Sequence, residues 1–223
     1  MFSHASQKRF FIPIRCVISI AFCLAIAFSP KGFSNVEVTQ EKMLSDIHQY
    51  FGDIPLLDQH GQHFKFFDLI RDKVVVLTPF LTRCENFCPS VMGMMLITQQ
   101  RLGDRFGNDV LFLSVTSDPE YDRPEIILDY VSKFGIQSGW HFLTGRPDVM
   151  DYLQRRLGFI LQKETPPPQQ HSVKMYIMDA KKDFRVATVS GRMDPDCLVK
   201  ILDKARTHSL GEQVPSVAKM CWE

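Results

Sequence analysis

Apolar and polar residues follow two alternating patterns through the middle of the chain. Short apolar and β-branched runs, such as VVVLTPF over Val74–Phe80, are typical of strands buried on both faces of a sheet. The segments between these runs are predicted to be helices. In chain order the predicted elements are strand 73–80, helix 90–106, strand 110–116, helix 123–134, strand 140–143 and helix 148–157. This alternation predicts a sheet with parallel strands and with helices on both of its faces.

The flanking segments extend the predicted domain at both ends. A helix is expected over Gln40–Tyr50, followed by a β-hairpin that turns at Gln59–Gln62, where Gly61 supplies a positive φ. After the proline-rich loop 165–170, the pattern predicts strand 172–178, a turn at 180–183, strand 184–189 and a last helix 195–206. This order predicts a thioredoxin-like α/β fold. The expected form is the larger, peroxiredoxin-type variant, with an N-terminal β-hairpin and helices on both faces of a mixed sheet.

Composition and charge narrow the class of protein. The 223 residues are 45% hydrophobic and 23% charged, which describes one ordinary globular domain with an appendage. Residues 1–34 contain four basic residues and no acidic one, so the formal net charge of +1 becomes −3 for residues 35–223. A domain this mildly acidic is not expected to bind nucleic acid.

The first 34 residues have the pattern of an export segment. Basic residues precede an apolar run over Cys16–Phe28, and small residues before Asn35 allow cleavage there. The run is short for a membrane span, which needs about 20 residues. We therefore expect residues 1–34 to be a signal peptide or an N-terminal membrane anchor, and residues 35–223 to be the domain. In either case the domain faces an oxidising compartment.

Candidate chemistry begins with a pair of cysteines. Cys84 and Cys88 are separated by three residues and followed by Pro89, at the junction between strand 73–80 and the next helix. A thiolate is both the nucleophilic and the metal-binding form of cysteine, and a helix N-terminus favours its negative charge. From spacing alone, the pair is either a structural disulfide or a reactive dithiol.

Four motifs in this order resemble the SCO/SenC family of copper proteins, which assist assembly of the copper site in cytochrome c oxidase. They lie within residues 50–206 and read CENFCP, SVTSDPEYDRPE, GWHFLTG and HSVKMYIMD. The resemblance implies that Cys84, Cys88 and His171 bind a copper ion. It also implies a partner, the copper-binding subunit of a terminal oxidase, and a location in the periplasm or at the outer face of the inner membrane. The family's usual Pro and Asp after the first cysteine are replaced here by Glu85 and Asn86.

Two functional hypotheses share these residues. Two thiolates and one imidazole suit copper in both oxidation states, whereas a structural zinc site ordinarily has four protein ligands. The leading hypothesis is a metallochaperone that passes copper on by ligand exchange; it breaks no substrate bond and is therefore not an enzyme. The alternative is a thiol:disulfide oxidoreductase that keeps the target's copper-ligand cysteines reduced, with Cys84 and Cys88 as the redox pair. His171 discriminates between them, because only the metal site needs it.

Two charged residues are candidates to support this site. Asp118 follows a predicted strand at the sheet edge where functional loops gather, so it is a candidate to support the metal ligands without binding the metal. The competing interpretation makes Asp118 a turn residue, with Asp122 as the cap of the helix near Pro124. Arg83, next to Cys84, either lowers the pKa of a thiol or is simply solvated.

The remaining sulfur-containing residues have structural interpretations. Met92, Met94 and Met95 follow the cysteine loop at helical spacing, and we expect them to fill the core rather than bind metal. Cys197 and Cys221 are predicted to form a disulfide that fixes the C-terminal tail after the last helix.

Overall fold

The computed structural model describes residues 31–84, 88–159, 174–181, 183–190, 194–207 and 221. The chain divides into two compact units, Met1–Val38 and Thr39–Glu223. In the first unit the described residues form the start of helix α2 (Lys31–Phe51). Residues 1–30 of the predicted export segment and the loop 165–170 fall outside the described residues, so these two expectations stay predictions. Among the described residues, no helix is both long and apolar enough to cross a bilayer.

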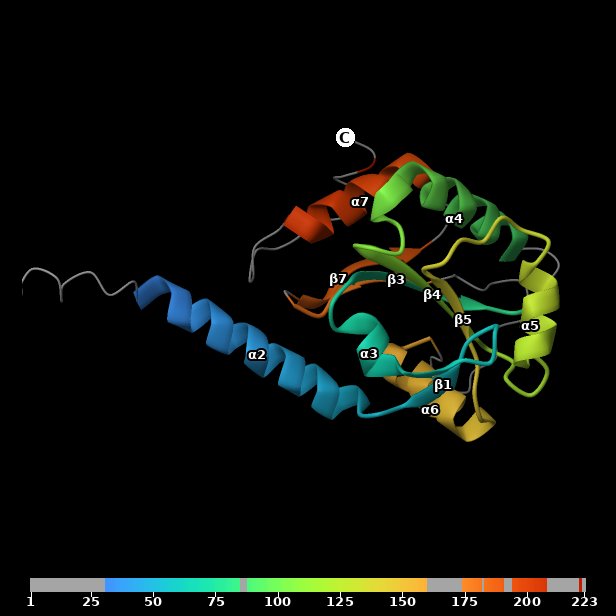
Figure 1. Ribbon diagram of the computed structural model, residues 1–223, viewed down its shortest axis with the longest axis horizontal. Coiled ribbons are helices and arrows are strands. Elements are labelled where there is room, and N and C mark those ends of the chain that lie inside the picture. Colours follow the sequence, from blue (N-terminus) through green and yellow to red (C-terminus); the bar gives the residue numbers. More distant parts are fainter. Residues whose placement is uncertain are drawn as a thin grey trace, which may run out of the picture. The chain divides into compact units, whose positions relative to one another are not determined.

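A five-stranded mixed sheet forms the centre of the second unit (Figure 1). Its strands lie in the order β5-β4-β3-β6-β7. Their bounds are β3 Val74–Phe80, β4 Val110–Thr116, β5 Trp140–Leu143, β6 Lys174–Asp179 and β7 Asp183–Ser190. Strands β3, β4 and β5 are parallel, while β6 is antiparallel to both β3 and β7. The predicted parallel core and antiparallel hairpin are therefore confirmed.

Helices cover both faces of this sheet, as predicted (Figure 1). One face packs against α4 (Cys88–Leu102), α5 (Pro124–Val131) and α7 (Pro195–Thr207). The other face packs against α2, α3 (Phe66–Ile70) and α6 (Pro147–Leu157). The period-two geometry of a strand divides β3 between the two layers, since Val74 and Val76 belong to the first core cluster and Val75 and Leu77 to the second. The fold is thus the predicted thioredoxin-like α/β architecture.

The predicted N-terminal hairpin is present and is attached to the end of β5. Strands β1 (Pro55–Leu57) and β2 (His63–Lys65) pair antiparallel, and Gly61 in their turn has a φ of 71°. The amides of Leu57 and Thr144 each donate to the other's carbonyl at 2.8 Å. These bonds fix the hairpin to the central sheet.

Element boundaries differ from the predictions in three places. Helix α2 begins at Lys31 instead of Gln40, and α5 ends at Val131, before the predicted end. Helix α4 begins at Cys88 and ends at Leu102, where Gly103 adopts a φ of 53° and a short 3-10 turn follows. The pattern missed α3 completely, because a helix of only five residues is too short to show a periodicity.

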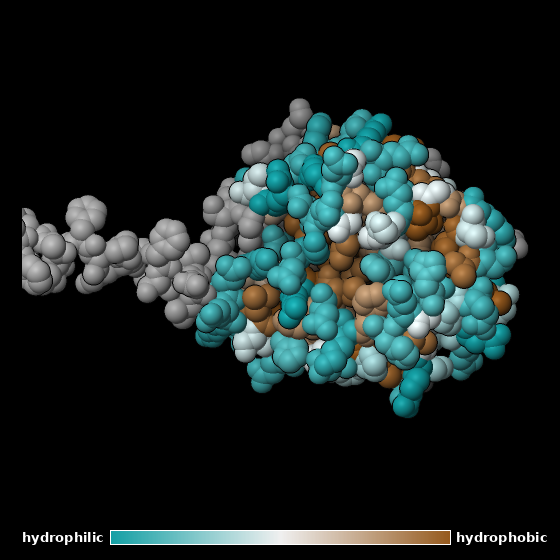
Figure 2. Space-filling model, in the orientation of Figure 1, coloured by the Kyte–Doolittle hydropathy of each residue, from teal (hydrophilic) through white to brown (hydrophobic). Residues whose placement is uncertain are grey.

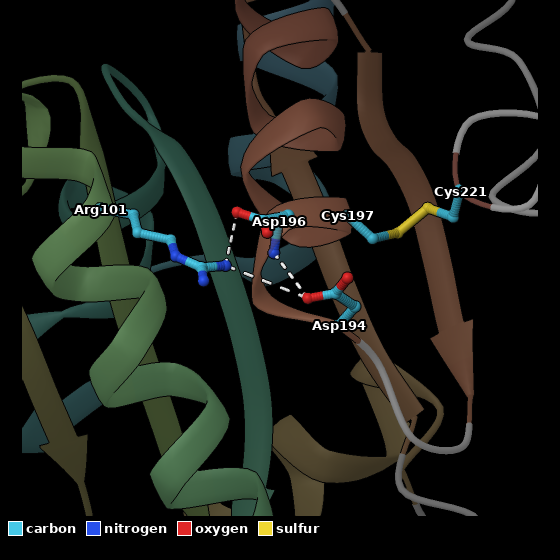
Figure 3. The surroundings of a disulfide bond; sticks show 5 residues. All are labelled: Arg101, Asp194, Asp196, Cys197 and Cys221. Atoms are coloured by element: carbon cyan, nitrogen blue, oxygen red, sulfur yellow. Dashed lines mark hydrogen bonds and ion pairs between the residues drawn. A yellow bond between two sulfur atoms is a disulfide. The ribbon is translucent and has the colours of Figure 1, made fainter.

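The predicted disulfide between Cys197 of α7 and Cys221 is confirmed, with 5.2 Å between the two Cα atoms (Figure 3). On the side of α7 that faces α4, Asp196 forms an ion pair with Arg101 at 2.5 Å. The view in Figure 2 shows hydrophilic side chains over most of one face of the molecule, with hydrophobic side chains gathered near its middle.

Candidate metal centre

The cysteine loop connects the end of β3 with the first residue of α4. Cys84 lies in the loop, and its amide donates to the carbonyl of Leu81 at 3.3 Å. Cys88 begins α4, and its amide donates to the Cys84 sulfur at 3.3 Å. Neither cysteine is in a disulfide, and both are partly buried. The pair therefore lies unbonded at a helix N-terminus, where negative charge is favoured.

The two thiols have different electrostatic surroundings. Burial, followed by the hydrogen bond and charge of Cys84, raises the pKa of the Cys88 thiol from 9.0 to about 12. The pKa of Tyr130 is also raised, chiefly by burial and then by the negative charges available at Cys88 and Cys84. Tyr130 and Cys88 line one small cavity of about 20 Å³, together with Trp140 and Ser114. This cavity has room for about one water molecule, so it is too small for an organic substrate.

Asp118 lies beside the cysteine loop. Its carboxylate forms an ion pair with Arg83, the residue that precedes Cys84. The Arg83 guanidinium also lies over the ring of Tyr121, 4.0 Å from its centroid. The partners of the Arg83 side chain are therefore Asp118 and Tyr121, so it is not simply solvated. Among the described contacts, none joins it to a cysteine sulfur.

Asp122 has a different role from the predicted helix cap. The residue at the N-cap of α5 is Arg123, and it makes no side-chain capping bond. The Asp122 carboxylate turns the other way and accepts hydrogen bonds from the hydroxyls of Thr82 and Thr116. The capping prediction was wrong because a tertiary contact with the cysteine loop competes for this carboxylate. A buried Asp between two functional loops is a contact that sequence spacing alone does not reveal.

Three of the residues named from the sequence lie outside the described residues: Glu85, Asn86 and His171. The described part of the chain contains no group of three or more His, Cys, Asp or Glu side chains that could hold a metal ion. Two thiols in contact are nevertheless a soft donor pair of the kind that Cu(I) prefers.

The methionines that follow the loop pack as core residues. Met92 and Met95 are 5% and 1% exposed, and Met94 packs against the same cluster. The core prediction for these side chains is confirmed.

Together these features define a thioredoxin-like α/β protein with a dithiol at the carboxyl end of its central parallel strand. A family model described as SCO1/SenC matches residues 42–206, and the chain belongs to this family. The sco1 protein of Schizosaccharomyces pombe is 27% identical over 158 residues, which make up 67% of this chain and 59% of the relative. The chain therefore matches somewhat more than half the length of that relative.

Solved structures support the assignment of the fold. The copper-bound structure of Arabidopsis thaliana ScoI has a TM-score of 0.57 at 22% identity, and the match covers 69% of this chain and 96% of ScoI. The structure of BsSco, a Sco-family cytochrome c oxidase assembly protein with a disulfide switch, has a TM-score of 0.57 at 19% identity. That match covers 69% of this chain and 91% of BsSco.

Proposed function

We propose that this chain is a metallochaperone that binds copper as its cargo through Cys84, Cys88 and His171, and assists assembly of the copper site of a terminal oxidase. The observation that carries the proposal is the pair of cysteines at the start of α4, which are not joined in a disulfide and in which the Cys88 amide donates to the Cys84 sulfur at 3.3 Å. Copper in the related Arabidopsis structure and the assembly role of BsSco support it.

The sheet register supports His171 as the third ligand. Strand β6 runs antiparallel to β3, with Tyr176 opposite Leu77. The first residues of β6 are therefore at the sheet edge where β3 ends and the cysteine loop begins. In the sequence, His171 is three residues before the first residue of β6, Lys174. Three protein ligands would leave a coordination position open for a ligand of the acceptor, as stepwise transfer requires.

A copper titration tests this proposal. The full chain, with the loop dithiol reduced, is titrated with Cu(II) and Cu(I), following the thiolate-to-Cu(II) absorption band and competition with a Cu(I) chelator. We expect His171→Ala to weaken copper binding and to change the absorption band, because one of three ligands is lost. His63→Ala, a change of an exposed histidine in β2, serves as the matched control and should leave both unchanged. Undiminished affinity in His171→Ala would contradict the three-ligand site.

The contact between the two sulfur-bearing residues also permits a second function, that of a thiol:disulfide oxidoreductase. In this function, one loop thiolate attacks a partner disulfide and forms a mixed disulfide, releasing one partner thiolate. The second loop cysteine then attacks the mixed disulfide and releases the other. Two electrons pass to the partner, and the chain is left with a Cys84–Cys88 disulfide. The disulfide switch of BsSco favours keeping this alternative.

The proposed partner is the copper-binding subunit of a terminal oxidase, outside the cytoplasm. We propose that residues 1–34 direct export and are then either removed or kept as an anchor. The disulfide between Cys197 and Cys221 supports an oxidising compartment, such as the periplasm or the outer face of the inner membrane.

A further inference from the structure

We propose that Asp122 is the positioning residue of the metal centre: its buried carboxylate attaches the cysteine loop to the loop between β4 and α5. It thereby holds Cys84 where the amide of Cys88 and the metal can reach its sulfur. The inference rests on the proposed copper function for its consequences, but the attachment itself is a property of the metal-free chain.

Three hydrogen bonds define the attachment. One carboxylate oxygen of Asp122 accepts the hydroxyl of Thr82, and the other accepts the hydroxyl of Thr116. The backbone amide of Thr82 lies 3.4 Å from the second oxygen. Thr82 is two residues before Cys84, while Thr116 ends β4, so one carboxylate joins the cysteine loop to the neighbouring strand.

The direction of these bonds follows from the neighbouring groups. The amide of Asp118 donates to the Thr116 hydroxyl oxygen at 2.9 Å, which leaves the Thr116 proton for Asp122. The carbonyl of Thr116 accepts the buried side chain of Gln154 at 2.6 Å. Thr116 is therefore held by two hydrogen bonds besides its own bond to Asp122, and it gives Asp122 a fixed position from which to bind the cysteine loop.

Because Asp122 is buried, its hydrogen bonds hold the cysteine loop more strongly than the nearby ion pair between Arg83 and Asp118 does. The Asp122 residue is 1% exposed, and its carboxylate accepts hydrogen bonds from two hydroxyls and one amide. Hydrogen bonds are electrostatically stronger inside the protein than at its surface, because solvent screens them less. The Arg83 and Asp118 side chains are 61% and 30% exposed, so their ion pair is screened by solvent. The loop is thus held mainly by Asp122.

Loss of the hydrogen bonds between Asp122 and Thr82 should also change the position of Cys84, because a short stretch of backbone connects Thr82 to Cys84. Between Thr82 and Cys84 there is only one residue, and the Cys84 amide bond to Leu81 closes a tight turn over the same segment. Without its side-chain anchor this turn opens more often. A smaller fraction of molecules then has Cys84 and Cys88 in the arrangement that binds the metal, so the affinity for copper falls. Changes in groups that orient metal ligands typically cost 10- to 100-fold in metal affinity.

Three variants of the full chain test the proposal: Thr82→Val, Asp122→Asn and the double variant. Thr98→Val is the matched control, since Thr98 is buried but its hydroxyl bonds to Met94 within α4, away from the loop. The readouts are the amide hydrogen exchange of the 81–84 segment in the metal-free, reduced chain, and Cu(I) affinity by chelator competition. Urea unfolding of each variant verifies that it is folded under these conditions.

We expect both single variants to increase exchange in the 81–84 segment and to weaken Cu(I) binding by about tenfold, while Thr98→Val changes neither. The double variant should bind Cu(I) no more weakly than the more impaired of the two single variants, because both changes break the contact between Thr82 and Asp122. Additive losses, or normal exchange in Thr82→Val, would overturn the attachment. The exchange result does not depend on copper, so a wild-type chain that fails to bind copper would refute the proposed function and leave the positioning role testable.

Discussion

At the residue scale, the two thiols of the cysteine loop differ although only three residues separate them. Cys84 lies in the loop and accepts the first amide of α4, while Cys88 lies in that helix and lines a cavity in the core. Burial and the contact with Cys84 raise the pKa of Cys88 to about 12. We therefore expect Cys84 to be the thiol that reacts first with a metal or a partner, and Cys88 to react second.

This asymmetry predicts unequal alkylation rates. In the folded, metal-free chain with a reduced loop, a thiol with a pKa of about 12 holds very little thiolate at pH 8. Iodoacetamide should therefore modify Cys88 more slowly than Cys84, and about a hundredfold or more slower than it modifies Cys88 in the urea-unfolded chain. Peptide mapping by mass spectrometry at timed intervals measures both rates. Equal rates for folded and unfolded Cys88 would contradict the described environment.

The site residues could be predicted from the sequence only where local chemistry marks them. Cys84 and Cys88 were identified because cysteines at a strand-to-helix junction are informative on their own. The carboxylate of Asp122 was misassigned, since its neighbours Pro124 and Arg123 make it look like a helix cap. Its actual partner, Thr82, is forty positions away in the sequence, and the hydrogen bond exists only because β3 and β4 are adjacent.

At the element scale, α7 is fixed on two sides. Asp196 binds Arg101 of α4, and the neighbouring Cys197 is directed away from this ion pair toward Cys221 (Figure 3). The ion pair is largely exposed, so it contributes at most about 1 kcal/mol. The disulfide closes a loop with a sequence separation of 24, which restricts the unfolded chain much more strongly.

Removal of this disulfide should lower the stability without affecting the metal centre. We expect Cys221→Ser to reduce the free energy of unfolding by about 3 kcal/mol, as the chain-entropy model gives for a loop of this size. Cys197 stays as a small apolar side chain in the core, so no cavity is created. Urea denaturation measures the change. Cys84→Ser is the matched control and should lose less than about 1 kcal/mol, since it replaces a partly buried loop thiol by a hydroxyl that can accept the same amide hydrogen bond. A stable Cys221→Ser variant would argue against the disulfide.

The elements themselves were more predictable than their ends. Buried parallel strands such as β3 and β4 are continuous apolar runs with no alternative interpretation. Helix ends depend on contacts that a pattern does not contain. Helix α4, for example, begins at Cys88, before the predicted Ser90, because the Cys88 amide finds its acceptor in the Cys84 sulfur.

At the scale of the whole molecule, the topology explains why the cysteine loop lies next to both of its supports. Parallel β3 and β4 end at the same edge, so the loops that carry Cys84 and Asp122 lie side by side. Antiparallel β6 begins at this edge too, because it runs against β3. Strand order therefore brings the dithiol, the buried carboxylate and the start of β6 to one edge of the sheet.

The two functions proposed for this edge differ in one residue, and a test in cells separates them. If the chain delivers copper, both Cys84→Ala and His171→Ala should abolish assembly of the oxidase copper site, because each removes a metal ligand. If it only reduces the target's cysteines, His171→Ala should assemble the oxidase normally. The measurement is oxidase activity, together with copper content of the purified oxidase, in cells where each variant is the sole copy and protein levels are matched. The His63→Ala chain controls for replacement of a histidine. Since both hypotheses need Cys84, the phenotype of His171→Ala alone decides whether this dithiol passes on metal or electrons.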